Sequence, residues 1–148
     1  MSTYTQIIYH IVFGTKGRKS VLVPDKREEL FRYVWGILKN KGCHLYRIGG
    51  ADDHIHILTS VHPTLALARL VKDVKISSSK WIRESGAFPG FEHWQDGYGG
   101  FTLSLKEKDA LIDYIKGQTE HHKKIAFKDE LRQLLEEAGV EFDERFLE

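Results

Sequence analysis

The chain has 148 residues, of which 41% are hydrophobic and 29% charged, and its formal net charge is +1. This composition is typical of a globular protein with one domain, and it excludes a membrane-spanning protein because no apolar run is long enough to cross a bilayer. The single cysteine, Cys43, cannot form an internal disulfide, and no signal-peptide pattern opens the chain. We therefore expect a cytoplasmic protein with a buried structural thiol.

The small net charge hides an uneven distribution along the chain. Residues 129–148 hold eight acidic and two basic side chains, out of 21 acidic and 22 basic in the whole sequence. Residues 1–128 are left with 13 acidic and 20 basic side chains. This excess of positive charge is enough to attract a polyanion, although a solvated basic surface would also explain it.

The N-terminal third predicts a strand, a basic turn and a helix. Gln6–Thr15 is apolar on both faces, which predicts a central strand. A turn containing Lys16 and Arg18 follows. Pro24 then opens a helix, because proline suits the first helical position, and apolar residues repeat at helical spacing up to Gly42.

A pair of histidines marks the third predicted strand. Cys43–Ile48 predicts the second strand, and a turn over residues 49–53 leads into a strand that carries His54 and His56. Side chains two apart on a strand share a face, so both histidines point away from the core. Their Cα atoms would lie roughly 6–7 Å apart, close enough to share a metal ion. The alternative is two polar residues on the wet face of an edge strand.

A long helix is predicted from about Thr64 to Glu84, with apolar side chains on one side and basic ones on the other. The basic side, called the basic stripe below, consists of Arg69, Lys72, Lys80 and Arg83. It would suit contact with phosphates, and a plain amphipathic surface helix is the alternative. In the glycine-rich loop of residues 91–100, Trp94 and Tyr98 could stack on unpaired bases, although loop aromatics more often pack over a core edge.

The C-terminal part predicts a fourth strand and two helices. Phe101–Ser104 reads as a short strand, and the Ser104-Leu105-Lys106-Glu107 capping box begins a helix. On that helix Tyr114 and Gln118 are four residues apart, one turn above the other. Phe127–Ala138 predicts a last helix, followed by an acidic and aromatic tail.

The order β-α-β-β-α-β followed by helices predicts an α+β, ferredoxin-like fold. Its four-stranded antiparallel sheet would carry helices on one face, plus the C-terminal helices, and the histidines would point to the open face. We expect one domain over residues 1–148, with a core at about 4–124 and an acidic helical tail at about 125–148.

Four segments carry a family resemblance. They are Tyr9–Lys16 in the first strand, Asp53–Leu58 with the two histidines, the Trp94–Tyr98 loop, and Tyr114 to Gln118 followed by His121-His122. Together they resemble the single-tyrosine HUH transposases of bacterial insertion sequences and their relatives associated with repetitive extragenic palindromes. The resemblance covers nearly the whole chain in order.

The resemblance implies chemistry on single-stranded DNA. Tyr114 would be the nucleophile, giving a 5′-phosphotyrosine and a free 3′-hydroxyl that later rejoins. His54, His56 and Gln118 would hold one divalent metal. Members of the family are typically homodimers that recognise hairpin DNA, and the acidic tail lies outside their catalytic pattern.

Physical chemistry agrees with these roles. A tyrosine has a pKa near 10, so its phenol is a poor nucleophile until the proton leaves. Two imidazoles and an amide oxygen suit Mg²⁺ or Mn²⁺ and leave the full charge of the cation for a phosphodiester. Covalent attack also conserves the energy of the broken bond, so that rejoining needs no ATP.

Several residues keep more than one interpretation. Asp53 would orient a ligating histidine or cap the turn, and His121 would touch DNA or favour the helix dipole. Tyr98 is the rival nucleophile. The expected DNA contacts are Lys16, Arg18, the basic stripe, Trp94, Tyr98 and His121. The alternative functions are a metal nuclease that uses water, a replication or relaxase enzyme with the same metal motif, and a non-catalytic protein that binds hairpin DNA or RNA.

Overall fold

The computed structural model describes residues 1–147 and contains one four-stranded antiparallel sheet in the order β2-β3-β1-β4. The strands are β1 (Ile8–Gly14), β2 (Leu45–Gly50), β3 (His54–Ser60) and β4 (Gly99–Thr102). The helices are α1 (Pro24–Asn40), α2 (Leu67–Ser85), α3 (Lys108–Lys116), α4 (Gln118–His122) and α5 (Phe127–Glu137). The succession β1-α1-β2-β3-α2-β4 confirms the predicted ferredoxin-like plan.

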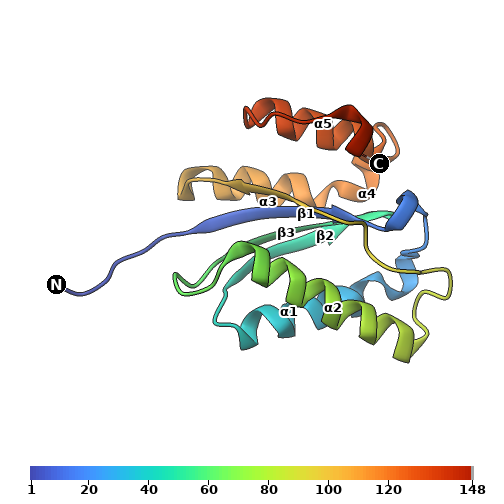
Figure 1. Ribbon diagram of the computed structural model, residues 1–148, viewed down its shortest axis with the longest axis horizontal. Coiled ribbons are helices and arrows are strands. Elements are labelled where there is room, and N and C mark those ends of the chain that lie inside the picture. The colour runs from blue at the N-terminus through green and yellow to red at the C-terminus, as the bar shows by residue number, and fades with distance from the viewer. Residues whose placement is uncertain (148) are drawn as a thin grey trace.

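Helices cover both faces of this sheet (Figure 1). On one face, Ile11, Phe13, Ile55 and Ile57 join the main core with apolar residues of α1 and α2. The other face lies under α3, α4 and α5. The expectation of an open face was therefore wrong, because the C-terminal helices pack on it.

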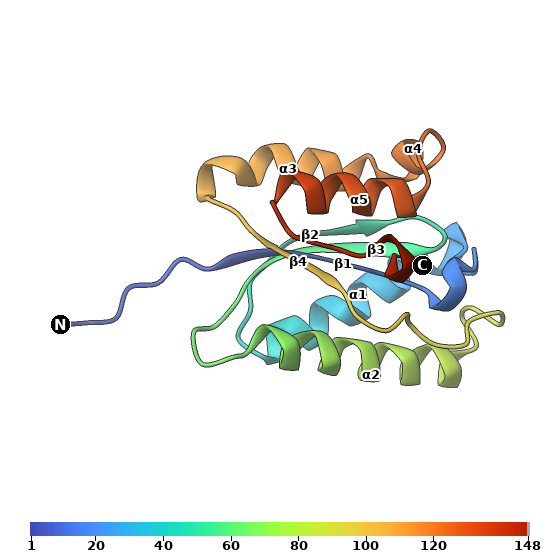
Figure 2. The same ribbon diagram turned by 45° about the horizontal axis from the view of Figure 1, so that its top comes forward.

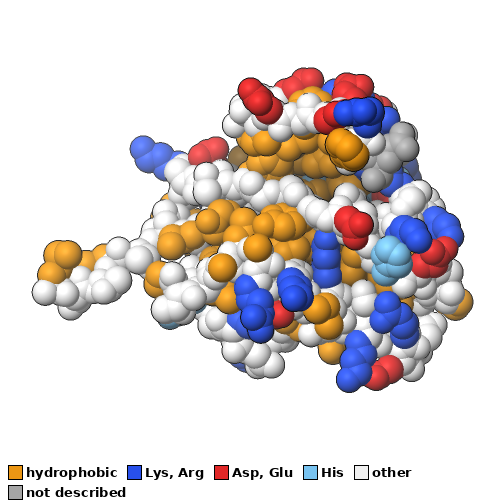
Figure 3. All heavy atoms as spheres, in the orientation of Figure 1, with side chains coloured by type: hydrophobic (Ala, Val, Ile, Leu, Met, Phe, Trp, Pro, Cys, Tyr) orange, Lys and Arg blue, Asp and Glu red, His pale blue; other side chains and the backbone are white. Residues whose placement is uncertain are grey.

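The last helix lies beside α3 and is held over the sheet by apolar contacts (Figure 2). Val12 of β1 forms a buried cluster with Phe127 and Leu131 of α5 and with Leu147 near the C-terminus. Fully burying one such side chain stabilises the fold by about 1.5–3 kcal/mol relative to leaving it exposed. Figure 3 shows hydrophobic side chains in the hollow beneath α5 and acidic ones on its outer side.

The second strand runs further than predicted and brings α3 close to the sheet. It continues through Gly50, where a turn was expected, and Gly49 pairs with His56. A Cβ atom at Gly49 would lie 2.7 Å from the backbone oxygen of Ile115. The missing side chain thus lets α3 rest directly on the strand, which fixes the position of the helix that carries Tyr114.

Other boundaries shift by a few residues. The helix α2 begins at Leu67 rather than Thr64, whose hydroxyl instead bonds the His62 ring at 2.7 Å. The helix predicted from the capping box is interrupted at Gly117, so that Tyr114 and Gln118 lie on the successive helices α3 and α4. Within residues 1–147, no helix has the length and apolarity needed to cross a membrane.

Candidate active site

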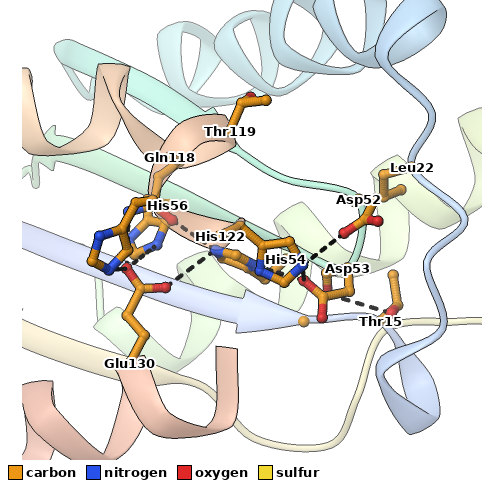
Figure 4. A network of polar contacts seen from close by, with 12 residues as sticks. Thr15, Leu22, Asp52, Asp53, His54, His56, Gln118, Thr119, His122 and Glu130 are labelled. Atoms are coloured by element: carbon orange, nitrogen blue, oxygen red, sulfur yellow. Dashed lines mark hydrogen bonds and ion pairs between the residues drawn. The ribbon is translucent and has the colours of Figure 1, made fainter. Parts of the chain in front are cut away.

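Strand β3 carries the two histidines of the predicted metal site side by side. The ring centroids of His54 and His56 are 5.1 Å apart, and both side chains are fully buried beneath the C-terminal helices (Figure 4). Their shared direction follows from the period of two along a strand. The two histidines thus share one face of the strand, as the sequence predicted, but that face is buried and not open to solvent.

Each ring nitrogen of His54 has a polar partner. Nδ1 is 2.7 Å from Oδ1 of Asp53, and Nε2 is 2.8 Å from Oε1 of Gln118. Burial alone would lower the pKa of His54, but its hydrogen bonds with Asp53, Glu130 and Gln118 raise it to about 9. Asp53 therefore fixes the ring through Nδ1 and leaves Nε2 facing Gln118.

The second histidine is held by a residue that the sequence analysis did not select. Nδ1 of His56 is 2.7 Å from Nε2 of His10, and the two rings stack at 5.0 Å. Burial and the neighbouring His56 lower the pKa of His10 to about 3, and burial lowers that of His56. When His56 donates its Nδ1–H to His10, its Nε2 keeps the lone pair that a metal requires.

The predicted nucleophile reaches the same place from α3. Tyr114 is half-buried, its ring lies edge-on to His56 with centroids 5.8 Å apart, and its hydroxyl donates to Glu130. Burial and the Glu130 carboxylate raise the pKa of Tyr114 above its ordinary value. The phenol is therefore protonated at neutral pH in this arrangement.

A carboxylate from the acidic tail completes the cluster. Glu130 of α5 is only 2% exposed, and it lies within 3.3 Å of His54 Nε2 and 3.5 Å of His56 Nε2. Burial would raise its pKa, but the contacts with His54 and His56 lower it, so the group is ionised. Sequence reasoning missed Glu130. The available signal was an acid on the apolar side of α5, between the buried Phe127 and Leu131.

The two histidines that follow Gln118, His121 and His122, lie near different carboxylates. His121 Nε2 is 3.6 Å from Oε2 of Glu130, and its ring lies 5.3 Å from that of Tyr114. His122 Nε2 is 3.0 Å from Oδ1 of Asp52. His121, which was expected to touch DNA, thus lies at the rim of the buried cluster.

The donor atoms of the cluster suit a divalent metal. His54 Nε2, His56 Nε2 and a Glu130 oxygen all lie within 4.8 Å of one another. In the part of the chain that the structure describes, His56 Nε2 is buried without a hydrogen-bond partner. A buried polar atom in this state is costly, and a bound cation would satisfy it.

The residues expected to contact DNA do not form one surface. The basic stripe is exposed along α2, on the opposite face of the sheet from α3, the helix of Tyr114 (Figure 1). Lys16 is exposed near Glu92, at 3.7 Å, whereas the Arg18 guanidinium lies 4.7 Å above the Phe127 ring. The structure therefore brings Tyr114, His54, His56 and Gln118 together, and it leaves the stripe apart from them.

The two aromatic residues of the glycine-rich loop have different environments. Tyr98 is 39% exposed, but Trp94 is 3% exposed and packs edge-on to Phe13. The Trp94 Nε1–H donates to the hydroxyl of Ser78 at 2.9 Å. The expected stacking of Trp94 on bases is thus wrong, because this ring belongs to the core. Lys75 steadies the loop by donating to the Gln95 carbonyl oxygen at 2.8 Å.

Several known proteins are similar to this chain in sequence. Residues 3–118 match the family described as "Transposase IS200 like". The ISDra2 transposase TnpA of Deinococcus radiodurans is 28% identical over 120 residues, which cover 76% of this chain and 84% of that protein. The IS200 transposase of Salmonella typhimurium is also 28% identical over 120 residues, with 78% of each chain covered.

Two solved structures share the fold. A putative transposase from Deinococcus radiodurans superimposes with a TM-score of 0.63 at 25% identity, over 80% of this chain and 95% of that one. The REP-associated tyrosine transposase bound to a REP hairpin gives a TM-score of 0.61 at 14% identity, over 84% of this chain and 76% of that one.

Proposed function

The chain belongs to the IS200-like family of single-tyrosine HUH transposases, and on this basis we propose that it cuts and rejoins single-stranded DNA through Tyr114. The observation that carries the proposal is the position of the Tyr114 phenol. It lies beside His56 and bonds a carboxylate that also contacts both histidines of β3. The proposed nucleophile and the candidate metal-binding atoms therefore lie side by side, which is the arrangement that such a reaction needs.

In the proposed reaction the phenol oxygen of Tyr114 attacks the phosphorus of a phosphodiester. The bond between phosphorus and the 3′-oxygen breaks, the 3′-oxygen takes a proton, and the phenol loses its own. The product is a 5′-phosphotyrosine, which a second 3′-hydroxyl later attacks to restore the phenol and the strand. Because burial and Glu130 raise the pKa of Tyr114, its proton must leave as the attack occurs.

We propose that His54, His56 and Gln118 hold one Mg²⁺ or Mn²⁺ ion for this step. Support comes from Nε2 of both histidines facing a common point and from Oε1 of Gln118, which lies 2.8 Å from His54 Nε2. Asp53 is hydrogen-bonded to Nδ1 of His54, and His10 to Nδ1 of His56, which fixes the orientations of the two rings. When bound, such an ion would polarise the phosphodiester and neutralise developing charge.

Hairpin DNA is the proposed ligand, and a homodimer is the proposed assembly. The related REP-associated transposase is bound to a REP hairpin, and the excess of basic residues in 1–128 would favour such a ligand here. The homodimer rests on the family resemblance. We likewise propose that residues 4–124 form the catalytic core, with the tail as an added part.

The basic stripe offers a test of where the hairpin binds. We expect the double substitution Lys72→Glu and Arg83→Glu to weaken hairpin binding about tenfold or more, because two phosphate contacts would be lost. The slope of log affinity against log salt concentration should also become shallower, by roughly one unit for each lost contact. The measurement is hairpin affinity as a function of salt concentration. The matched control is Arg32→Glu with Lys39→Glu, the same charge change at exposed positions of α1. Equal slopes in both variants would make the stripe ordinary solvated surface.

A covalent adduct is the direct test of the proposed chemistry. The protein incubated with labelled single-stranded hairpin DNA and Mn²⁺ should form a band that survives denaturant, and the label should map to the peptide containing Tyr114. Cleavage without an adduct would instead indicate a nuclease that uses water. Hairpin binding without cleavage would indicate a non-catalytic binding protein.

A further inference from the structure

The acidic tail contributes a buried charge to the site, although it lies beyond the family match. The match ends at residue 118, whereas α5 spans Phe127–Glu137. Phe127, Glu130 and Leu131 are its buried residues and face the sheet. A carboxylate in this position is expensive unless it is paired or coordinates a metal. The placement of Glu130 therefore needs a partner of positive charge.

The contacts of Glu130 identify what that partner can be. Oε1 is 3.3 Å from His54 Nε2, and Oε2 is 3.5 Å from His56 Nε2. Oε2 also accepts hydrogen bonds from the Gln118 amide at 2.8 Å and from the Tyr114 hydroxyl. The atoms around the carboxylate are thus the proposed metal donors, which Figure 4 shows beside Glu130, and the hydroxyl of the proposed nucleophile.

The separations fit ligands arranged round one ion. Donor atoms at about 2.1 Å from a Mg²⁺ ion in octahedral geometry lie about 3 Å from their neighbours. The distances from the Glu130 oxygens to the two histidine nitrogens, 3.3 and 3.5 Å, are close to that value. Mg²⁺ and Mn²⁺ also favour carboxylate oxygens over imidazoles.

We propose that Glu130 is a further ligand of the divalent metal, supplied by the tail to the site of His54, His56 and Gln118. This inference rests on the proposed metal site. Glu130 would add one anionic ligand to three neutral ones. The carboxylate raises the affinity of the site for a hard cation. It also neutralises one unit of the positive charge that the metal would otherwise present to the phosphate. Through Oε2 it also ties the Tyr114 hydroxyl to the metal site.

Mn²⁺ binding to the full chain without DNA tests this role. Titration calorimetry should show that Glu130→Gln, which keeps the shape of the side chain, weakens Mn²⁺ binding by at least about tenfold. The control is Glu137→Gln, an exposed acid on the same helix, which should bind as the parent does. The rise in melting temperature caused by Mn²⁺ should shrink in Glu130→Gln but not in Glu137→Gln, and the metal-free melting curve shows whether the variant is folded.

The variant His56→Ala separates this proposal from the one on which it rests. Weak Mn²⁺ binding in both Glu130→Gln and His56→Ala supports the role of Glu130. Weak binding in His56→Ala alone overturns the role of Glu130 and keeps the histidine site. Undiminished binding in both variants, or none in the parent protein, overturns the metal site itself. If Glu130→Gln binds Mn²⁺ normally and forms the DNA adduct faster, the carboxylate blocks the site and is not a ligand.

Discussion

Replacing Tyr114 with phenylalanine should give a protein that binds Mn²⁺ and hairpin DNA but neither cuts the strand nor becomes attached to it. The substitution removes one oxygen atom and keeps the ring that lies against His56. Glu130 loses one hydrogen bond but keeps that of the Gln118 amide. Because strand breakage and attachment are one event in the proposed reaction, both should fall by roughly 10⁴-fold or more, as when other enzymes lose a nucleophile. The measurement is cleavage and adduct yield on labelled hairpin DNA.

The control for this result is Tyr98→Phe. Tyr98 is exposed in the loop after Trp94, so that loss of its hydroxyl should leave the adduct in place. A nuclease that uses water would keep most of its activity in the Tyr114→Phe variant, since its nucleophile is untouched. If Tyr114→Phe cuts and Tyr98→Phe does not, Tyr98 is the nucleophile.

Removing the proposed metal should have an effect of similar size. We expect EDTA, or the substitution His56→Ala, to reduce cleavage by roughly a thousandfold or more, because a metal contributes several kcal/mol to stabilising such a reaction. Hairpin binding should largely survive, since the proposed phosphate contacts lie elsewhere on the protein. His54→Ala should behave likewise. Cleavage rates and hairpin affinity are measured in parallel on each protein.

Two comparisons make this test specific. His62→Ala changes an exposed histidine just after β3 and should leave cleavage unchanged. EDTA treatment of the unmodified protein involves no substitution, so it separates loss of metal from damage to the buried core. Full activity in EDTA would contradict the metal hypothesis even if His56→Ala were inactive.

Local patterns were enough to predict the parts of the site that depend on local geometry. The period of two along a strand aligned His54 with His56, and the spacing of four aligned Tyr114 with Gln118. The second alignment survives although a break at Gly117 places these residues on two helices. The ferredoxin-like fold followed from the succession of elements, because few topologies accommodate β-α-β-β-α-β.

The remaining members of the cluster depend on contacts between distant segments. His10 meets His56 because β1 pairs with β3 in a register that sets His10 opposite Leu58, and no local pattern specifies that register. Glu130 enters only because α5 packs over Val12. Trp94 was misjudged for a similar reason, since its burial depends on Phe13 and Ser78 from other elements.

The sheet lies between α2, which carries the basic stripe, and α3, which carries the half-buried Tyr114 (Figure 1). Helices and sheets stack at about 10 Å per layer, so that roughly 20 Å separates the outer surface of α2 from the site. A hairpin whose stem rests on α2 must send its single strand round an edge of the sheet. The thickness of the protein would then act as a ruler that sets the minimum spacing between the foot of the hairpin and the cleaved bond.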